Sequence, residues 1–160
     1  MYINDSSSRV RTRPNVRVFI AHSKMQADRA RMLQQALSSF GYLLRLDLID
    51  MSVGKAEAEV RSEICAAFKW ATHIVVLATS EYVSKSSRYC RFEIEWLAKM
   101  SDSRRRFVLV LKDRSALKAS VFMKELSAFE TLDVDVSNLD PNREVQGRSL
   151  VCAVVQFLDR

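Results

Sequence analysis

Glycine and proline are scarce in this chain of 160 residues, which holds three glycines and two prolines. Collagen-like and low-complexity sequences need far more of both, and a turn-dense all-β sandwich is disfavoured for the same reason. The longest apolar runs, Ile74 to Ala78 and Phe107 to Leu111, fall far short of the roughly 18 residues that span a bilayer. The N-terminus also lacks an apolar secretory core. We therefore expect one soluble domain of the α/β or all-α class.

Positive charge of this chain is concentrated near its beginning. The sequence has 25 Lys and Arg against 19 Asp and Glu, a formal net charge of +6. Up to Arg17 it holds four arginines against one aspartate, which is half of that excess. We expect residues 1–15 to be a flexible Ser/Arg-rich leader and residues 16–160 to form the domain. Elsewhere both signs are interspersed, and the basic run Arg104 to Arg106 is expected in a loop, so neither nucleic acid nor a membrane is an expected partner.

Metal and cofactor motifs are absent. The three cysteines are widely spaced and match neither a disulfide framework nor a metal-ligand pattern, so we expect reduced thiols and a cytoplasmic protein. No G-x-G-x-x-G, P-loop, H-E-x-x-H or G-x-S-x-G motif occurs, and the two histidines lack ligand-like spacing. Conventional dehydrogenases and P-loop NTPases are thereby excluded, metalloenzymes and serine hydrolases lose support, and we expect no metal and no resident cofactor.

Two periodicities alternate along the rest of the chain. Short runs of β-branched and aromatic residues alternate with segments whose apolar residues recur every three or four positions. The expected strands are residues 16–21, 42–48, 73–79, 107–111 and 131–136, and the expected helices lie around residues 30–40 (with Phe40 on the apolar face and a stop at Gly41), 60–68, 89–100, 120–129 and 150–158. Right-handed crossovers then give an α/β, flavodoxin-like five-stranded parallel sheet with helices on both faces. Its ligand site should lie at the carboxyl ends of the strands, near the switch point.

The helix expected at residues 89–100 carries one carboxylate on its apolar face. Glu93 shares that face with Tyr89, Trp96 and Met100, whereas Glu95 has a basic residue four positions to either side, as on a solvated face. An inward carboxylate is costly unless it is hydrogen-bonded, paired or beside a cleft. Glu93 is therefore either a structural hydrogen-bond acceptor or a functional carboxylate, and the periodicity leaves both open.

Two further features lie where expected strands end. His22 ends the first strand, on the side from which ligands approach, while His73 begins an apolar strand and is expected to be structural. Asp47, Gly54 and Lys55 would bring a carboxylate, a permissive backbone and a cation to the same edge. The residues alone favour the other interpretation of these last three, a plain surface loop with a glycine turn.

Several motifs, in order along the chain, resemble the Toll/interleukin-1 receptor (TIR) domain family. Residues 18–23 (VFIAHS) resemble its opening V-F-I-S-[HY]-S box, with Ala21 in place of serine. Asp47 followed by Gly54 and Lys55 resembles its BB loop, and residues 74–77 (IVVL) its third strand. Residues 87–94 (SRYCRFEI) are similar to its S-x-W-C-x-x-E-L box, with tyrosine in place of tryptophan. The likeness covers about residues 16–157.

The resemblance implies a candidate activity. Some TIR domains only assemble, whereas others hydrolyse NAD⁺ to nicotinamide and a linear or cyclic ADP-ribose. The catalytic glutamate of those enzymes falls on Glu93, and the tryptophan of their W-x-x-x-E motif falls on Tyr89. Such an enzyme needs one carboxylate to stabilise the oxocarbenium-like transition state, because the departing nicotinamide is neutral. NAD⁺ is then the substrate and not a cofactor.

The same resemblance implies the remaining site residues and partners. Asp47, Gly54 and Lys55 fall on positions that line or gate the cleft, and His22 and Ser23 are expected to contact the substrate. The loop from residue 47 to residue 57 is expected to mediate self-association or contact with other TIR domains in signalling or defence. The alternative is a non-catalytic TIR interaction module. A receiver-like domain is disfavoured, because the first strand is not followed by the acidic pair that would hold Mg²⁺.

Overall fold

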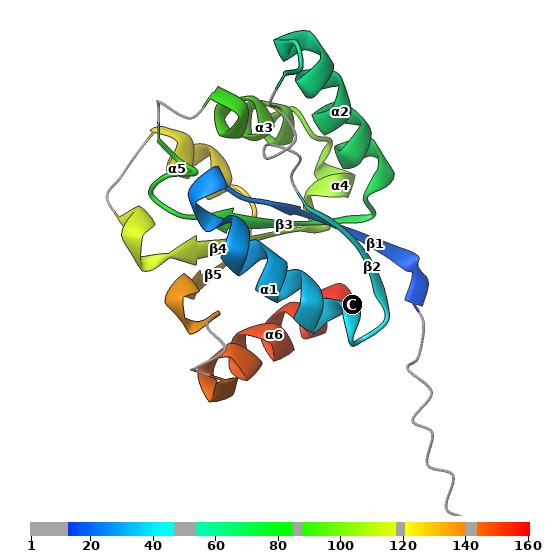
Figure 1. Ribbon diagram of the computed structural model, residues 1–160, viewed down its shortest axis with the longest axis vertical. Coiled ribbons are helices and arrows are strands. Elements are labelled where there is room, and N and C mark those ends of the chain that lie inside the picture. The colour runs from blue at the N-terminus through cyan, green and yellow to red at the C-terminus, as the bar shows by residue number, and fades with distance from the viewer. Residues whose placement is uncertain (1–12, 47–53, 85–87, 118–120, 140–143) are drawn as a thin grey trace, which may run out of the picture.

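The computed structural model describes residues 13–46, 54–84, 88–117, 121–139 and 144–160. Within them, five parallel strands form one sheet in the order β2-β1-β3-β4-β5 (Figure 1). The strands are β1 (Arg13–Ala21), β2 (Tyr42–Leu46), β3 (His73–Ala78), β4 (Val108–Asp113) and β5 (Glu130–Val134). The helices are α1 (Ala27–Ser38), α2 (Glu57–Trp70), α3 (Arg88–Ala98), α4 (Asp102–Arg105), α5 (Val121–Leu126) and α6 (Glu144–Leu158), with 3₁₀ turns η1 (Lys24–Gln26), η3 (Arg114–Leu117) and η4 (Val136–Asn138). The expected flavodoxin-like α/β fold is confirmed.

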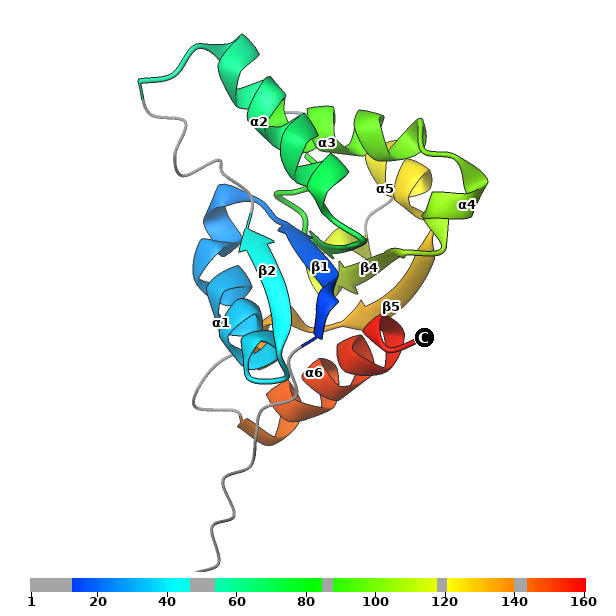
Figure 2. The ribbon, with the colours of Figure 1, turned by 90° about the vertical axis from the view of Figure 1, so that its right-hand side faces the viewer.

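Helices cover both faces of the sheet. Figures 1 and 2 show α1 and α6 on one face and α2, α3 and α5 on the other. Because successive side chains of a strand point to opposite faces, Phe19 and Ile74 join the core under α2 and α3, whereas Ile20 and Val75 pack with α1 and α6. β3 is buried along its whole length, which is why it is an uninterrupted apolar run in the sequence.

Two expectations about local structure were wrong. Phe40 does not extend the buried stripe of α1, because that helix ends at Ser38 and leaves Phe40 38% exposed in the turn before Gly41. Gly41 itself has φ +89°, the left-handed conformation expected at a helix stop. Arg104 is not in a loop but in α4, which starts after Ser101 and carries Asp102 in its first turn, an arrangement that favours helix initiation.

Other boundaries differ by a few residues. β1 begins at Arg13, earlier than expected, and its pairing with β2 is irregular between Arg13 and Arg17. The expected end of the second strand and the turn expected at residues 140–142 lie outside the described residues.

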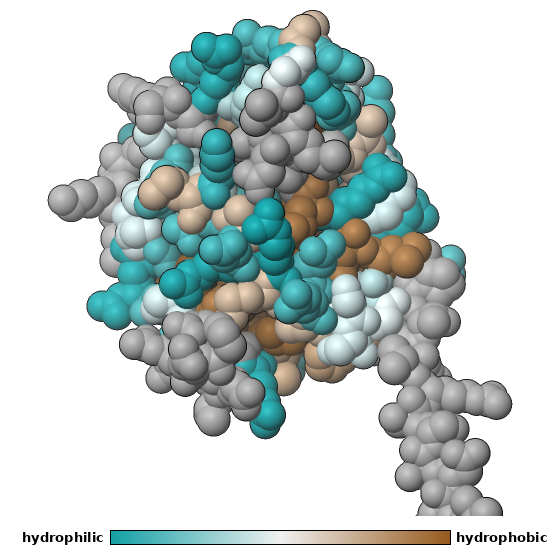
Figure 3. Space-filling view, in the orientation of Figure 1, coloured by the Kyte–Doolittle hydropathy of each residue, from teal (hydrophilic) through white to brown (hydrophobic). Residues whose placement is uncertain are grey.

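The surface shows few large apolar side chains. Among the described residues, Met25, Phe40 and Leu43 are the exposed large hydrophobic ones. On the face drawn in Figure 3, hydrophobic areas are small and separated by hydrophilic residues. None of the three cysteines forms a disulfide. Across the part of the chain that the structure describes, no helix combines the length and the apolar character needed to cross a membrane.

Candidate active site

The switch point of the sheet lies between β1 and β3. From β1 the chain passes through α1 to β2 on one side, and it returns through α2 to β3 on the other. The connections that leave β1 and β3 therefore diverge, and in this fold class ligands bind at the carboxyl ends of such a pair. His22 and Ser23 follow β1, and the turn that begins at Thr79 follows β3.

Glu93 on α3 is buried beside this edge of the sheet. Its side chain is 0% exposed, and its Oε2 accepts a hydrogen bond of 3.2 Å from the hydroxyl of Tyr82, which is also fully buried. The neighbouring Cys90 donates a weak bond of 3.9 Å from its thiol to the carbonyl oxygen of His22. α3 is thereby held against the end of β1, so His22, Tyr82 and Glu93 come together from three segments.

The expected division of α3 into two faces is confirmed. Glu93 lies among buried residues of this helix, whereas Glu95 is exposed. The sequence pattern therefore identified the inward carboxylate correctly. Tyr89, one turn before Glu93, is half-buried and packs against the core under α3.

Tyr82 is a site residue that the sequence pattern did not reveal. It lies in a Ser-rich segment between the expected strand at residues 73–79 and the expected helix at residues 89–100, and the turn after β3 fixes its backbone. The amide of Tyr82 donates to Thr79 Oγ1 at 3.3 Å, and the amide of Val83 donates to the carbonyl oxygen of Thr79 at 3.1 Å. The one available signal was the pair of bulky residues, Tyr82 and Val83, within that polar segment.

His22 and Ser23 are both buried at the end of β1, being 1% and 3% exposed. His22 Nδ1 lies 2.8 Å from the carbonyl oxygen of Ser23, and because a carbonyl only accepts, Nδ1 carries the proton. Within the described part of the chain, His22 Nε2 and Ser23 Oγ are buried without a hydrogen-bond partner, and so is Glu81 Oε2. Buried polar atoms of this kind are rare in proteins and mark functional edges or water sites.

The end of the expected BB loop lies at the start of α2. Gly54 has φ +82° and is exposed, and a Cβ at this position would meet nothing within 4 Å. Lys55 pairs with Glu63 of α2 at 2.6 Å, and this hydrogen bond raises the pKa of Lys55. Glu57 pairs with Arg88 at 3.2 Å, which links the start of α2 to the start of α3. Asp47 lies outside the described residues.

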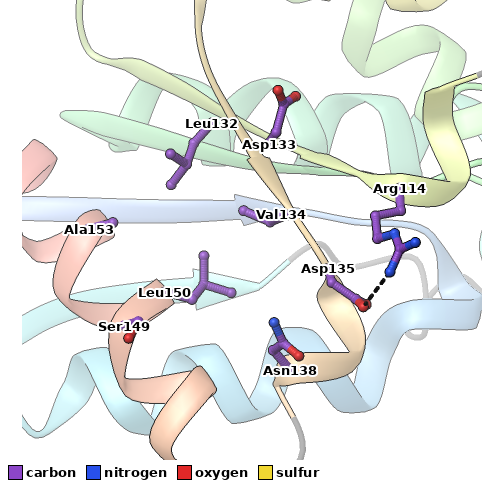
Figure 4. A pocket seen from close by; sticks show the side chains of 9 residues that line it. All are labelled: Arg114, Leu132, Asp133, Val134, Asp135, Asn138, Ser149, Leu150 and Ala153. Carbon is purple, nitrogen blue, oxygen red and sulfur yellow. Dashed lines mark ion pairs between the residues drawn. The ribbon is translucent and has the colours of Figure 1, made fainter.

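A separate hollow of about 430 Å³ lies between β5 and α6. Figure 4 shows Arg114 and Asp135 at one end of it, 3.7 Å apart, with Leu132, Val134 and Leu150 between the strand and the helix. Its lining includes none of the buried unpartnered atoms found in the described residues. We therefore place the candidate site at the carboxyl ends of β1 and β3, where those atoms gather.

Comparisons with known proteins identify a family for this chain. The family model described as TIR domain matches residues 18–147, which is most of the chain and includes residues 18–21 of β1 and all of α3 with Glu93. No curated protein and no solved structure matched the chain. The match extends from the first core strand into α6. The chain therefore belongs to the TIR domain family.

Proposed function

We propose that this TIR domain hydrolyses NAD⁺ at the bond between nicotinamide and ribose. The observation that carries the proposal is Glu93, a carboxylate on the inner face of α3 with no exposed surface, next to the carboxyl ends of β1 and β3. A carboxylate in a water-poor site acts strongly on positive charge that develops in a transition state. Membership of the TIR family supports a TIR-type signalling module, with or without catalytic activity.

The proposed reaction uses water as the second substrate. The bond between ribose C1′ and the nicotinamide nitrogen breaks, and its electron pair neutralises the pyridinium ring. The ribose that remains has oxocarbenium character, which Glu93 stabilises while it accepts hydrogen bonds from ribose hydroxyls. Water adds to C1′ and releases one proton, giving ADP-ribose; attack by the adenine ring in place of water gives the cyclic product.

Other residues of the edge would hold Glu93 and the substrate. Tyr82 orients the carboxylate through its hydroxyl and so is a positioning residue. Tyr89, half-buried one turn away, supplies an aromatic wall for the nicotinamide or the ribose. Because Glu93 has no exposed surface in this conformation, substrate entry requires the edge to open. We propose that contact with a second TIR domain favours the open form.

The second candidate is a TIR interaction module without turnover, acting in the cytoplasm in signalling or defence. The burial of Glu93 and its bond to Tyr82 also suit a purely structural carboxylate. Lys55, matched to a cleft position, is engaged by Glu63. These two observations favour an assembly surface that needs no open cleft.

Nicotinamide release separates the two candidates. We expect purified protein at high concentration to release nicotinamide from NAD⁺, quantified by chromatography, and Glu93→Ala to abolish it. Glu95→Ala is the matched control, because it removes an exposed carboxylate two positions along the same helix. Equal rates for the wild type and Glu93→Ala would remove Glu93 from the reaction. No release by the assembled wild type would favour the interaction module.

A further inference from the structure

We infer that His22 and Ser23 form a recognition pair for a primary carboxamide, the group that distinguishes nicotinamide from related pyridines. The inference rests on the proposed function, and it assigns the nicotinamide end of the substrate to the end of β1. Two observations carry it: the hydrogen bond that places a proton on His22 Nδ1 and the buried Ser23 hydroxyl without a partner in the described part of the chain.

The His22 ring presents a hydrogen-bond acceptor. Its Nδ1 donates to the carbonyl oxygen of Ser23 at 2.8 Å, so in the neutral ring the lone pair is on Nε2. Nε2 is buried, and no hydrogen-bond partner for it is found in the described residues. An N–H or O–H donor of a ligand is the group that this atom can bind.

Ser23, the next residue along the chain, presents a hydrogen-bond donor. It occupies the cap position before η1, yet its side chain makes no capping hydrogen bond. Its carbonyl oxygen accepts from Gln26 N at 3.0 Å as well as from His22, which fixes the backbone. The Oγ is buried without a partner in the described part of the chain, so its O–H is available to a carbonyl oxygen.

A primary carboxamide carries the complementary pair of groups. Its N–H can donate to His22 Nε2, and its C=O can accept from Ser23 Oγ. Ribose hydroxyls are the other donors at the reacting end of NAD⁺, and these are assigned to the Glu93 carboxylate. A methyl ketone keeps the carbonyl and loses the N–H, while a carboxylate loses the N–H and adds a negative charge. The pair should therefore favour nicotinamide over 3-acetylpyridine and nicotinate.

The histidine spectrum of the intact chain tests this pair directly. The chain has two histidines, so ¹⁵N-histidine labelling gives signals from two imidazole rings. His73 lies at the amino end of β3, away from the proposed site, and serves as the internal control. Nicotinamide should shift the Nε2 signal of His22 and leave His73 unchanged, and 3-acetylpyridine and nicotinate should not. An equal response to nicotinamide and 3-acetylpyridine, or no response of His22 up to the solubility limit of nicotinamide, would overturn the inference.

Variants of Ser23 supply the matching affinity test. Ser23→Ala should weaken nicotinamide binding about three- to tenfold, the worth of one neutral hydrogen bond. Ser23→Thr keeps the hydroxyl and should bind as the wild type does. Ser80→Ala, an exposed serine at the same edge, is the control and should change nothing. Unaltered His73 signals in each variant will show that the fold is retained.

Turnover distinguishes this inference from the proposed hydrolase. The preference for NAD⁺ over its thionicotinamide analogue, which keeps the N–H groups but has sulfur, a weaker acceptor, in place of the carbonyl oxygen, should fall in Ser23→Ala by up to about three- to tenfold. Because this preference is compared between the wild type and Ser23→Ala, the different leaving abilities of nicotinamide and its analogue cancel. If NAD⁺ is not cleaved but nicotinamide still shifts His22, the hydrolase fails and the carboxamide pair stands. If NAD⁺ is cleaved and the preference is the same in Ser23→Ala, the pair fails and the hydrolase stands.

Discussion

The two ends of the central sheet differ in whether their polar groups have hydrogen-bond partners. At the amino end, Arg104 donates to the carbonyl oxygens of Phe68 and Ala71 at the end of α2, at 3.2 and 3.3 Å. Arg105 donates in the same way to the carbonyl oxygen of Ala98, the last residue of α3, and to that of Met100 just beyond it, at 3.1 and 3.3 Å. These arginines satisfy carbonyl groups that helix ends leave open, and they place positive charge where the helix dipole is negative.

The carboxyl end has buried polar atoms without partners in the described part of the chain. His22, Ser23 and Glu81 each contribute one such atom, and Glu93 adds a buried carboxylate nearby. Leaving such groups unsatisfied costs stability, about 1 to 3 kcal/mol each in typical cases. This difference is what we expect if the amino end of the sheet stabilises the fold and the carboxyl end binds the proposed ligand.

The largest expected effect comes from removing the charge at the carboxyl end. Glu93→Gln keeps an oxygen that can accept from Tyr82, so we expect the fold to persist. It lacks the negative charge that the oxocarbenium needs, and nicotinamide release should fall about 10²- to 10³-fold. Chromatographic rates, with thermal unfolding alongside, check both statements. If the glutamine variant keeps most of the activity, positioning and not charge is what residue 93 contributes.

Arg104 provides the opposite test, at the amino end. Arg104→Ala removes charged hydrogen bonds to two carbonyl groups of the α2 terminus and should lower the free energy of unfolding by about 1.5 to 3 kcal/mol. Nicotinamide release below the unfolding temperature should be unchanged. Arg106→Ala is the control, since Arg106 is exposed and lies over the Phe107 ring. A loss of activity in folded Arg104→Ala would show that the two ends are not independent.

Short-range patterns predicted much of this molecule, and contacts between distant residues limited the rest. The apolar run of β3, the stop at Gly41 and the inward position of Glu93 follow from periodicity and from glycine's freedom. The bond between Tyr82 and Glu93 joins the turn after β3 to α3 across 11 positions, and the contact of Cys90 with His22 spans 68 positions. Neither has a periodic signal. The capping role of Arg104 could not be predicted from local sequence either, because the carbonyl groups it binds lie 33 and 36 positions away.

A third prediction concerns access to the carboxyl end through self-association. Gly54 has φ +82°, which proline cannot adopt, so Gly54→Pro must redirect the chain just before α2, at a position where a Cβ would meet nothing within 4 Å. Specific activity of the wild type should rise with protein concentration, and that of Gly54→Pro should stay about tenfold lower, a typical coupling. Thermal stability should be unchanged.

Gly54→Asn is the matched control for that variant. Asparagine tolerates positive φ, so this variant should behave as the wild type does. Wild-type specific activity that is flat on dilution, together with a single monomeric species in light scattering, would rule the coupling out.

The smallest expected effect is a pH dependence of the free energy of unfolding, caused by His73 at the amino end of the sheet. His73 begins β3, bonds to Thr72 Oγ1 at 2.9 Å and packs edge-on against the rings of Phe107 and Phe157. Burial lowers the pKa of His73 below its usual 6.5, so the unfolded chain takes up this proton before the folded one as the pH falls. The free energy of unfolding should therefore decrease from about pH 7 downward, until the folded ring is protonated too. One proton limits the slope to about 1.4 kcal/mol per pH unit. Urea unfolding at several pH values should give a shallower slope in His73→Gln, with nicotinamide release unchanged; parallel slopes in the two proteins would show that His73 does not carry this dependence.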